Sequence, residues 1–297
     1  MSANKESNGD RIFECVNYCI VTLFFLIVLY PLIYVLSCSI SSPDLVATGK
    51  VIFFPKGITL AGYKRVFQDS NILLGYKNTL FYTAAGTLIN LLVTVPAGYA
   101  LAKKELPGRK FFMYFFMFIM YFSGGMIPTF LLIKSLRLYN TRTILLILGA
   151  FNTYNCIICR TFFAAIPKEL EEAAEIDGSS RFRTFLQIIL PTSQALLGVM
   201  VLYFAVTHWN SYFPALMYVS DDKIKPLQLF LRKILILQEA SSAMLDGMDD
   251  DVIAEQTKLR ELIKYSVIVV SSLPVLILYP FLQKYFVQGI MIGSVKG

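Results

Sequence analysis

The chain has 297 residues, of which 56% are hydrophobic and only 16% are charged. A soluble globular domain carries about 25% charged residues, so this composition excludes that class and indicates a membrane protein. The formal net charge of +7 at pH 7 is scattered over short loops and the ends of apolar runs. Anionic membrane lipids are therefore the expected counterions, and no nucleic-acid partner is predicted.

The apolar runs define the expected architecture, because a helix needs roughly 20 residues to cross about 30 Å of hydrocarbon. We predict an all-α, polytopic membrane protein with a single transmembrane domain over residues 1–297 and six transmembrane helices. The helices are expected at about Ile12–Ser37, Thr79–Ala102, Phe111–Ile133, Ile144–Phe163, Ala195–Tyr218 and Tyr265–Phe286.

The short loop KKELPGRK, between the second and third predicted spans, indicates the orientation. It gathers Lys103, Lys104, Arg109 and Lys110, and the positive-inside rule places such a loop in the cytoplasm. Both termini and the segment 166–191 are then expected in the cytoplasm of a cell-membrane protein. The two longer polar segments, 41–78 and 220–264, are expected to be outer loops.

Motifs for catalysis and nucleotide binding do not occur in the sequence. Gly57 and Gly62 have the separation of a phosphate-binding loop, but Tyr63 stands where that loop requires lysine. Cys156 and Cys159 form a CxxC inside a predicted span without a second pair, so helix packing is expected rather than a metal site. We therefore predict no enzyme activity, no metal and no bound cofactor, and the energy must come from a gradient or another subunit.

One polar stretch, EEAAEIDGSSRFRTFLQIILP, interrupts the apolar pattern at residues 171–191. Pro167 suits a first helical turn and acidic residues follow it, as the helix dipole favours. Gly178 can end that helix in the left-handed conformation, and Ser179 or Ser180 can cap the next one. The pattern predicts a helix, turn and helix outside the bilayer, built either to dock another protein or simply to connect two spans.

The same stretch resembles the EAA motif of the membrane-spanning subunits of ATP-binding-cassette (ABC) importers. The defining positions of the motif are all filled, by Glu172, Ala173, Ala174, Gly178, Ile188, Leu190 and Pro191. The resemblance implies the type I importer permease fold and a coupling helix that sits in a cleft of a cytoplasmic ATPase. Asp177 and Arg181 are expected to belong to the same coupling surface.

Further stretches narrow the resemblance. HWNSYFPAL, from His208, is similar to a pattern in the fifth span of maltose-type sugar permeases, and GIMIGSVKG resembles the tail of their second permease subunit. That tail implies that Lys296 and Gly297 reach the ATPase dimer interface. Asn78-Thr79-Leu80, FSGGMIPTFLL and PLQLFLRKIL are similar to the branch that imports complex oligosaccharides and polysaccharide fragments in Gram-positive bacteria.

This resemblance implies a permease subunit that forms half of the pathway of an ATP-driven carbohydrate importer, with oligosaccharides as the expected substrates. The implied partners are a second similar permease, two ATPase subunits that bind ATP and Mg²⁺, and a lipid-anchored extracellular sugar-binding protein. A gradient-driven carrier would be expected to hold ionisable residues within its spans and to show related halves. A membrane scaffold or receptor would not need the coupling segment.

Candidate pathway residues come from the amides and aromatics of the spans. Aromatic faces stack on sugar rings and amides bond to hydroxyls, so Trp209, Asn210 and Tyr212 are predicted to line a sugar path if they face a cavity. Asn90 and Asn152 are further candidates. The alternative for the aromatics is core packing, and for the amides it is hydrogen bonding between helices.

Overall fold

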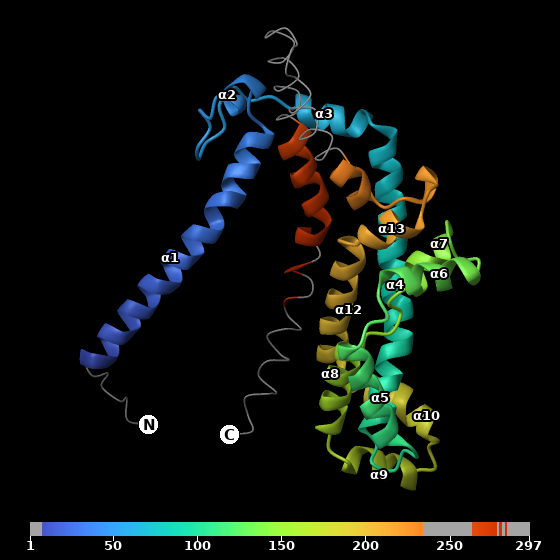
Figure 1. Cartoon of the computed structure of the whole chain (residues 1–297). Coiled ribbons are helices and arrows are strands. Elements are labelled where there is room, and N and C mark those ends of the chain that lie inside the picture. The colour runs from blue at the N-terminus through green and yellow to red at the C-terminus, as the bar shows by residue number, and fades with distance from the viewer. Residues whose placement is uncertain (1–7, 234–262, 278, 281–282, 284–297) are drawn as a thin grey trace. The chain divides into compact units, whose positions relative to one another are not determined.

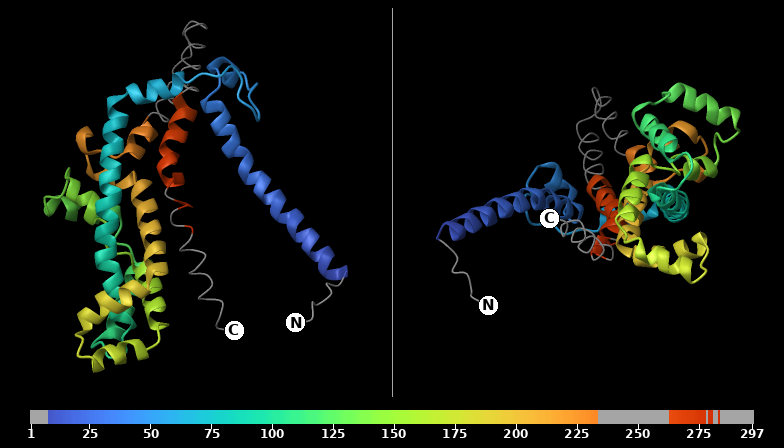
Figure 2. Two further views of the ribbon diagram at one scale, coloured as in Figure 1. Left: turned by 180° about the vertical axis from the view of Figure 1, so that it is seen from behind. Right: turned by 90° about the horizontal axis from the view of Figure 1, so that it is seen from below.

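The computed structural model describes residues 8–233, 263–277, 279–280 and 283, and all regular structure in this part of the chain is helical. The prediction of an all-α protein is confirmed for these residues. They fall into two compact units, one from the described residues up to 69 together with 233 and 263–272, and the other from residues 70–232 and the described residues after 272. Figures 1 and 2 show the helices of each unit.

The first unit contains α1 (Asn8–Ser39), α2 (Pro43–Ala47), α3 (Ala61–Gln68) and the start of the helix Ile263–Ile277. The end of α1 contacts that last helix, where the ring of Tyr34 meets the ring of Tyr265 edge to face at 5.8 Å. Cys38, Val46 and Val51 are buried beside Tyr265. This small apolar cluster holds α2 and its loop against the end of α1.

The first predicted span corresponds to α1, which is apolar around its whole circumference. Its large side chains are exposed within the chain, for example Phe13 at 71% and Phe24 at 64%. A helix of this length that is hydrophobic on all sides needs lipid or another protein around it. The helix therefore fits a membrane span.

The second unit is organised around the long helix α4 (Ser70–Ala102). It packs against α8 (Thr153–Ala164) and α12 (Gln194–Trp209), as both views of the bundle show (Figures 1 and 2). The core joins these helices to residues 185–189, which follow the polar residues 171–184. It consists of Val95, Cys159, Phe163, Phe185, Ile189, Leu196, Met200 and Phe204. This core therefore fixes α4, α8 and α12 relative to one another.

The remaining elements of this unit are short. They are α5 (Arg109–Tyr121), α6 (Met126–Ser135), α7 (Arg142–Ile147), α9 (Glu169–Ile176), α10 (Arg181–Thr184), the π-helical turn η1 (Phe185–Ile189), α11 (Leu190–Thr192), α13 (Phe213–Tyr218) and the 3-10 turn η2 (Asp222–Ile224). Residues 227–233 are helical as well. In Figure 1, α9 and α10 lie at the C-terminal end of α4, far from α13.

Close contact between α4 and α8 depends on Gly98. A Cβ atom at this position would lie 2.4 Å from the Cβ of Cys159 and 3.1 Å from the backbone nitrogen of Arg160. Cys159 itself has no exposed surface. The glycine therefore lets the two helix backbones approach as membrane helices do at small residues.

Three predicted spans are interrupted in the structure. The third divides into α5 and α6 with a bend of 113°, at a break where Gly125 has a φ of +87°. The fourth divides into α7 and α8, because Gly149 turns at a φ of +84° and Asn152 caps α8. The fifth stops at Trp209, and Pro214 then fits the first turn of α13.

The second span also differs, since α4 begins at Ser70 rather than at about Thr79. Within the described residues, two helices are long and apolar enough to cross a membrane, or up to four if each bent pair forms one span. Of the sixth predicted span, residues 263–277 are helical and most of the rest lies outside the described residues. The count of six stays a prediction.

We predict that Gly98→Ala destabilises the bundle. Overpacking a tight contact costs about 1–3 kcal/mol, which exceeds the gain of up to about 1 kcal/mol in helix propensity. The measurement is the midpoint of thermal unfolding in detergent. Gly124→Ala is the matched control, since a Cβ atom there meets nothing within 4 Å; equal midpoints for both variants would contradict the close contact.

Candidate functional site

The polar stretch forms the predicted elbow of two helices, and Gly178 is its turn. The residue adopts a φ of +76°, which glycine tolerates best. Its N–H donates to the carbonyl of Glu175 at 3.0 Å, and the N–H of Ser179 donates to the carbonyl of Ala174 at 2.9 Å. These two bonds make a Schellman motif, so the sequence ends α9 in a defined geometry.

The second arm of the elbow is anchored in the core. The side chain of Ser180 caps α10 by accepting from the N–H of Arg183 at 3.4 Å. The ring of Phe185 then packs on Tyr99 of α4, with 4.7 Å between centroids, and Ile189 is completely buried. The second arm of the elbow therefore packs into the same core as α4, α8 and α12.

The first arm is tied to the end of α4 by an ion pair. Lys103, just after α4, pairs through Nζ with the carboxylate of Glu171 in α9, and its ammonium lies 4.4 Å from the ring centroid of Tyr99. Partial burial lowers the pKa of Lys103, and the carboxylates of Glu105 and Glu175 oppose this shift.

The predicted coupling residues divide into exposed and supporting positions. Ala174 is buried at 4% exposure, so of the two alanines only Ala173 is open to another protein. Ile188 and Leu190 are partly buried, and Leu190 packs against the core. Lys296 and Gly297 lie outside the described residues. The exposed predicted positions are Glu172, Ala173, Asp177, Gly178, Arg181 and Pro191.

Three exposed apolar residues on the elbow were not among the coupling residues predicted from the sequence. Leu170 is 42% exposed, Ile176 is 87% exposed and Phe182 is 72% exposed. Their signal was present in the sequence, since each is a large apolar side chain within a charged stretch. Together with the exposed charges they give the elbow the composition of a protein contact surface.

The predicted pathway residues on α12 and beyond it differ in exposure. Trp209 is buried at 4% exposure, and its ring centroid lies 6.0 Å from that of Tyr76 on α4. Asn210 follows as the C-terminal cap of α12 and is exposed, while Tyr212 is 37% exposed. Trp209 thus joins helices, whereas Asn210 and Tyr212 present their side chains at the surface of the unit.

Asn90 is buried and joins three elements. Its Nδ2 donates to the carbonyls of Gly149 and Ala150, at 2.8 and 3.0 Å. Its Oδ1 lies 2.7 Å from Nε2 of His208 on α12. The amide therefore ties the broken fourth span to α4 and α12. Asn152 is exposed, and its side chain caps α8 through the N–H of Asn155 at 2.9 Å.

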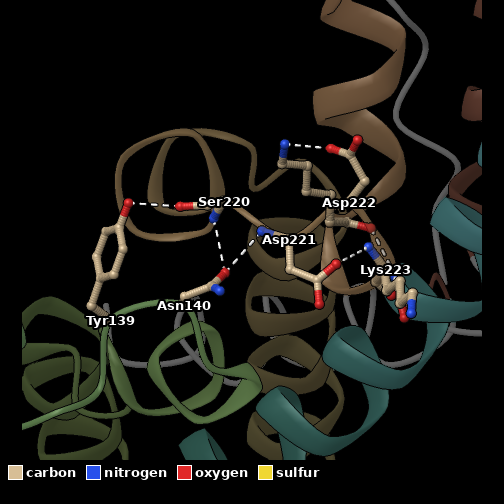
Figure 3. A network of polar contacts seen from close by, with 8 residues as sticks. Tyr139, Asn140, Ser220, Asp221, Asp222 and Lys223 are labelled. Atoms are coloured by element: carbon tan, nitrogen blue, oxygen red, sulfur yellow. Dashed lines mark hydrogen bonds and ion pairs between the residues drawn. The ribbon is translucent and has the colours of Figure 1, made fainter.

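A second polar network lies between the α6–α7 loop and the residues after α13, as Figure 3 shows. Oδ1 of Asn140 accepts from the backbone N–H groups of Ser220 and Asp221, each at 2.9 Å. The Tyr139 hydroxyl is 2.7 Å from Oγ of Ser220, and Asp221 accepts from the N–H of Lys223 at 2.9 Å. These bonds fix the two loops to each other.

Comparison with known proteins identifies the family. A family model for the inner membrane component of binding-protein-dependent transport systems matches residues 1–222. The chain belongs to this family of permeases. It is therefore the non-catalytic, multi-pass membrane component of an ABC transport system that also uses a binding protein and an ATPase.

Two curated relatives of the permease come from Bacillus subtilis (strain 168). Protein LplC is 39% identical over 98% of this chain and 97% of the relative. The polygalacturonan/rhamnogalacturonan transport system permease protein YtcP is 36% identical over 97% of this chain and 99% of the relative.

One similar solved structure is a bacterial ABC transporter involved in the import of the acidic polysaccharide alginate. It matches the permease with a TM-score of 0.83 and 35% identity, over 96% of this chain and 100% of that chain. The resemblance to importer permeases found in the sequence is thus confirmed, as is the helical permease fold.

We predict that Lys103→Met lowers transport severalfold while changing the free energy of unfolding by less than about 1 kcal/mol, because the pair is partly exposed. The matched control is Lys104→Met, an exposed neighbour with the same charge change. The measurements are ATP-driven uptake and thermal unfolding. The exchange of charges in Lys103→Glu with Glu171→Lys should restore part of the uptake, and equal effects at both lysines would contradict a role for the ion pair.

Proposed function

We propose that this permease forms half of the translocation pathway of an ATP-driven importer of oligosaccharides or polysaccharide fragments. The similarity that extends over nearly the whole chain supports this substrate class, because two of the similar proteins have names or titles that refer to polysaccharides. The observation that carries the mechanism is the elbow of α9, Gly178 and α10, which is fastened to α4 at both arms.

In the proposed cycle, a cytoplasmic ATPase holds the exposed face of this elbow. Closure of the ATPase dimer on ATP pushes on α9, and the Lys103–Glu171 pair together with the Tyr99–Phe185 contact passes the movement to α4. The spans then open outward, and hydrolysis returns them inward. The ATPase shifts this equilibrium only by the difference between its contacts in the two states.

The proposed assembly has a second, similar permease, two ATPase subunits that bind ATP and Mg²⁺, and a lipid-anchored binding protein outside the cell. Both termini are proposed to lie in the cytoplasm, which places the elbow on the ATPase side. Lys296 and Gly297 are proposed to reach the ATPase dimer. The exposed apolar residues Ile176 and Phe182 extend the proposed coupling surface beyond the motif positions.

For the sugar path, we assign two roles to the candidate residues. Asn210, Tyr212 and Asn152 are proposed to contact the sugar, a role that their exposure permits. Asn90 and Trp209 are proposed to shape the wall of the path from behind, since their contacts are made to Gly149, Ala150, His208 and Tyr76 of the same chain.

We predict that Gly178→Val abolishes coupling while the chain still inserts into the membrane. A side chain in the left-handed conformation costs about 1–2 kcal/mol and distorts the Schellman turn. The control is Gly49→Val, since Gly49 also has a positive φ, of +67°, and open space around it. Uptake and ATPase copurification are measured; intact uptake in Gly178→Val combined with Glu172→Lys contradicts the coupling role.

The proposed orientation is tested with a single reporter cysteine. The exposed Cys15 and Cys19 are first replaced by serine, and Ala173→Cys is then introduced. An impermeant maleimide should label this cysteine only in inside-out vesicles, and bound ATPase should protect it. Labelling from the outside of intact cells would reject both the orientation and the coupling role.

The substrate class is tested on the complete transporter. Copurified permeases and ATPase are reconstituted with the binding protein and screened with oligosaccharides for stimulated ATP hydrolysis. Stimulation by at least one oligosaccharide is the expected result. A transporter that responds only to peptides, amino acids or ions would overturn the carbohydrate assignment.

A further inference from the structure

Two sequence motifs that are far apart in the chain meet at the N-terminal end of α4. Nδ2 of Asn78 donates to the carbonyls of Lys223 and Lys225, both at 2.9 Å. Oγ1 of Thr79 accepts from the N–H of Leu227 at 2.8 Å. The Asn-Thr pair of α4 therefore holds the backbone that leads into residues 227–233.

The helical residues 227–233 also pack closely on α4. A Cβ atom at Gly75 would lie 2.9 Å from Cα of Leu227 and 3.0 Å from Cδ2 of Phe230. Leu227 is fully buried, and Leu231 is 6% exposed. Because hydrogen bonds and close packing both fix this helix, the polar residue at its end has a defined place.

That residue is Arg232, whose guanidinium lies over the ring of Tyr212 with 4.7 Å to the centroid. Arg232 is partly exposed and Tyr212 is 37% exposed, so solvent reaches the stacked pair. No carboxylate among the described residues pairs with Arg232. A positioned arginine is left here without a counterion from the described chain.

The stacking geometry determines what this arginine can bind. A guanidinium that uses its face for an aromatic ring still has its in-plane N–H groups available. Those groups match a planar carboxylate and bind it through two parallel, charge-assisted hydrogen bonds. The exposed side chain of Tyr212 lies directly beside these groups. A sugar unit whose carboxylate pairs with Arg232 would therefore also lie next to Tyr212.

We propose that Arg232, held over Tyr212, binds the carboxylate of an acidic sugar unit and so selects anionic oligosaccharides. This inference rests on the proposed carbohydrate permease function and adds the charge of the substrate to it. Arg232 is here a specificity-determining residue, and Asn78 and Thr79 are positioning residues that keep its helix in place on α4.

The experiment uses the complete transporter in proteoliposomes, with saturating binding protein and two matched sugars. One is an oligogalacturonate and the other is its methyl ester, which lacks the charge. Arg232→Gln should lower uptake of the acidic sugar at least about tenfold, the size of one lost charge-assisted bond. Uptake of the ester should stay unchanged. Arg232→Lys should be intermediate, because lysine keeps the charge but not the planar fork.

The control is Lys233→Gln, which removes the same charge from the neighbouring exposed residue and should leave both uptakes unchanged. Equal losses of both sugars in Arg232→Gln would show a packing role and overturn the inference. A loss that appears only in liposomes with anionic lipid would assign Arg232 to a headgroup and also overturn it. Wild-type uptake of the ester alone rejects the acidic selectivity but keeps the carbohydrate function; uptake of no sugar at all rejects the function itself.

Discussion

The structure of the second unit depends on the contact of α4 with α8 and α12. This helix supplies Val95 to the core, Gly98 to the approach of α8, and Asn90 to the hydrogen bonds that reach α12 and the broken fourth span. In a bilayer the hydrophobic effect adds little between helices, so close packing and buried amide bonds must supply the association. Both of those contributions converge on α4.

The two ends of α4 carry different chemistry. At its C-terminal end, Tyr99 and Lys103 hold the two arms of the elbow. At its N-terminal end, Asn78 and Thr79 hold the segment that positions Arg232. One helix therefore connects the surface proposed to meet the ATPase with the surface proposed to meet the sugar.

Much of the elbow could be predicted from the sequence because its turn and its caps follow local rules. The turn at Gly178 and the cap at Ser180 depend on residues within one or two helical turns, and both occur in the structure. The burial of Ala174 could not be read in this way, because it depends on which side of α9 faces the rest of the chain. Periodicity in so short a helix does not decide that question.

Contacts between residues of separate elements could not be predicted from the sequence either. The pairing of Lys103 with Glu171 and the stacking of Arg232 on Tyr212 join residues from separate elements, and no spacing rule connects them. The apolar runs predicted continuous spans, but hydropathy does not report the turns at Gly125 and Gly149. Hydropathy measures the apolar character of a stretch, whereas a break in a helix depends on backbone conformation and capping.

The glycine contact between α4 and α8 has a mechanical consequence. Two backbones that touch at Gly98 leave no room for one helix to slide past the other, so in the proposed cycle α4 and α8 are expected to move together. Any increase in the distance between this helix pair and its neighbours must then occur at hinges elsewhere in the backbone. Candidates for such hinges are the 83° corner before α12 and the glycine corner between α5 and α6, where helical bonding is already interrupted.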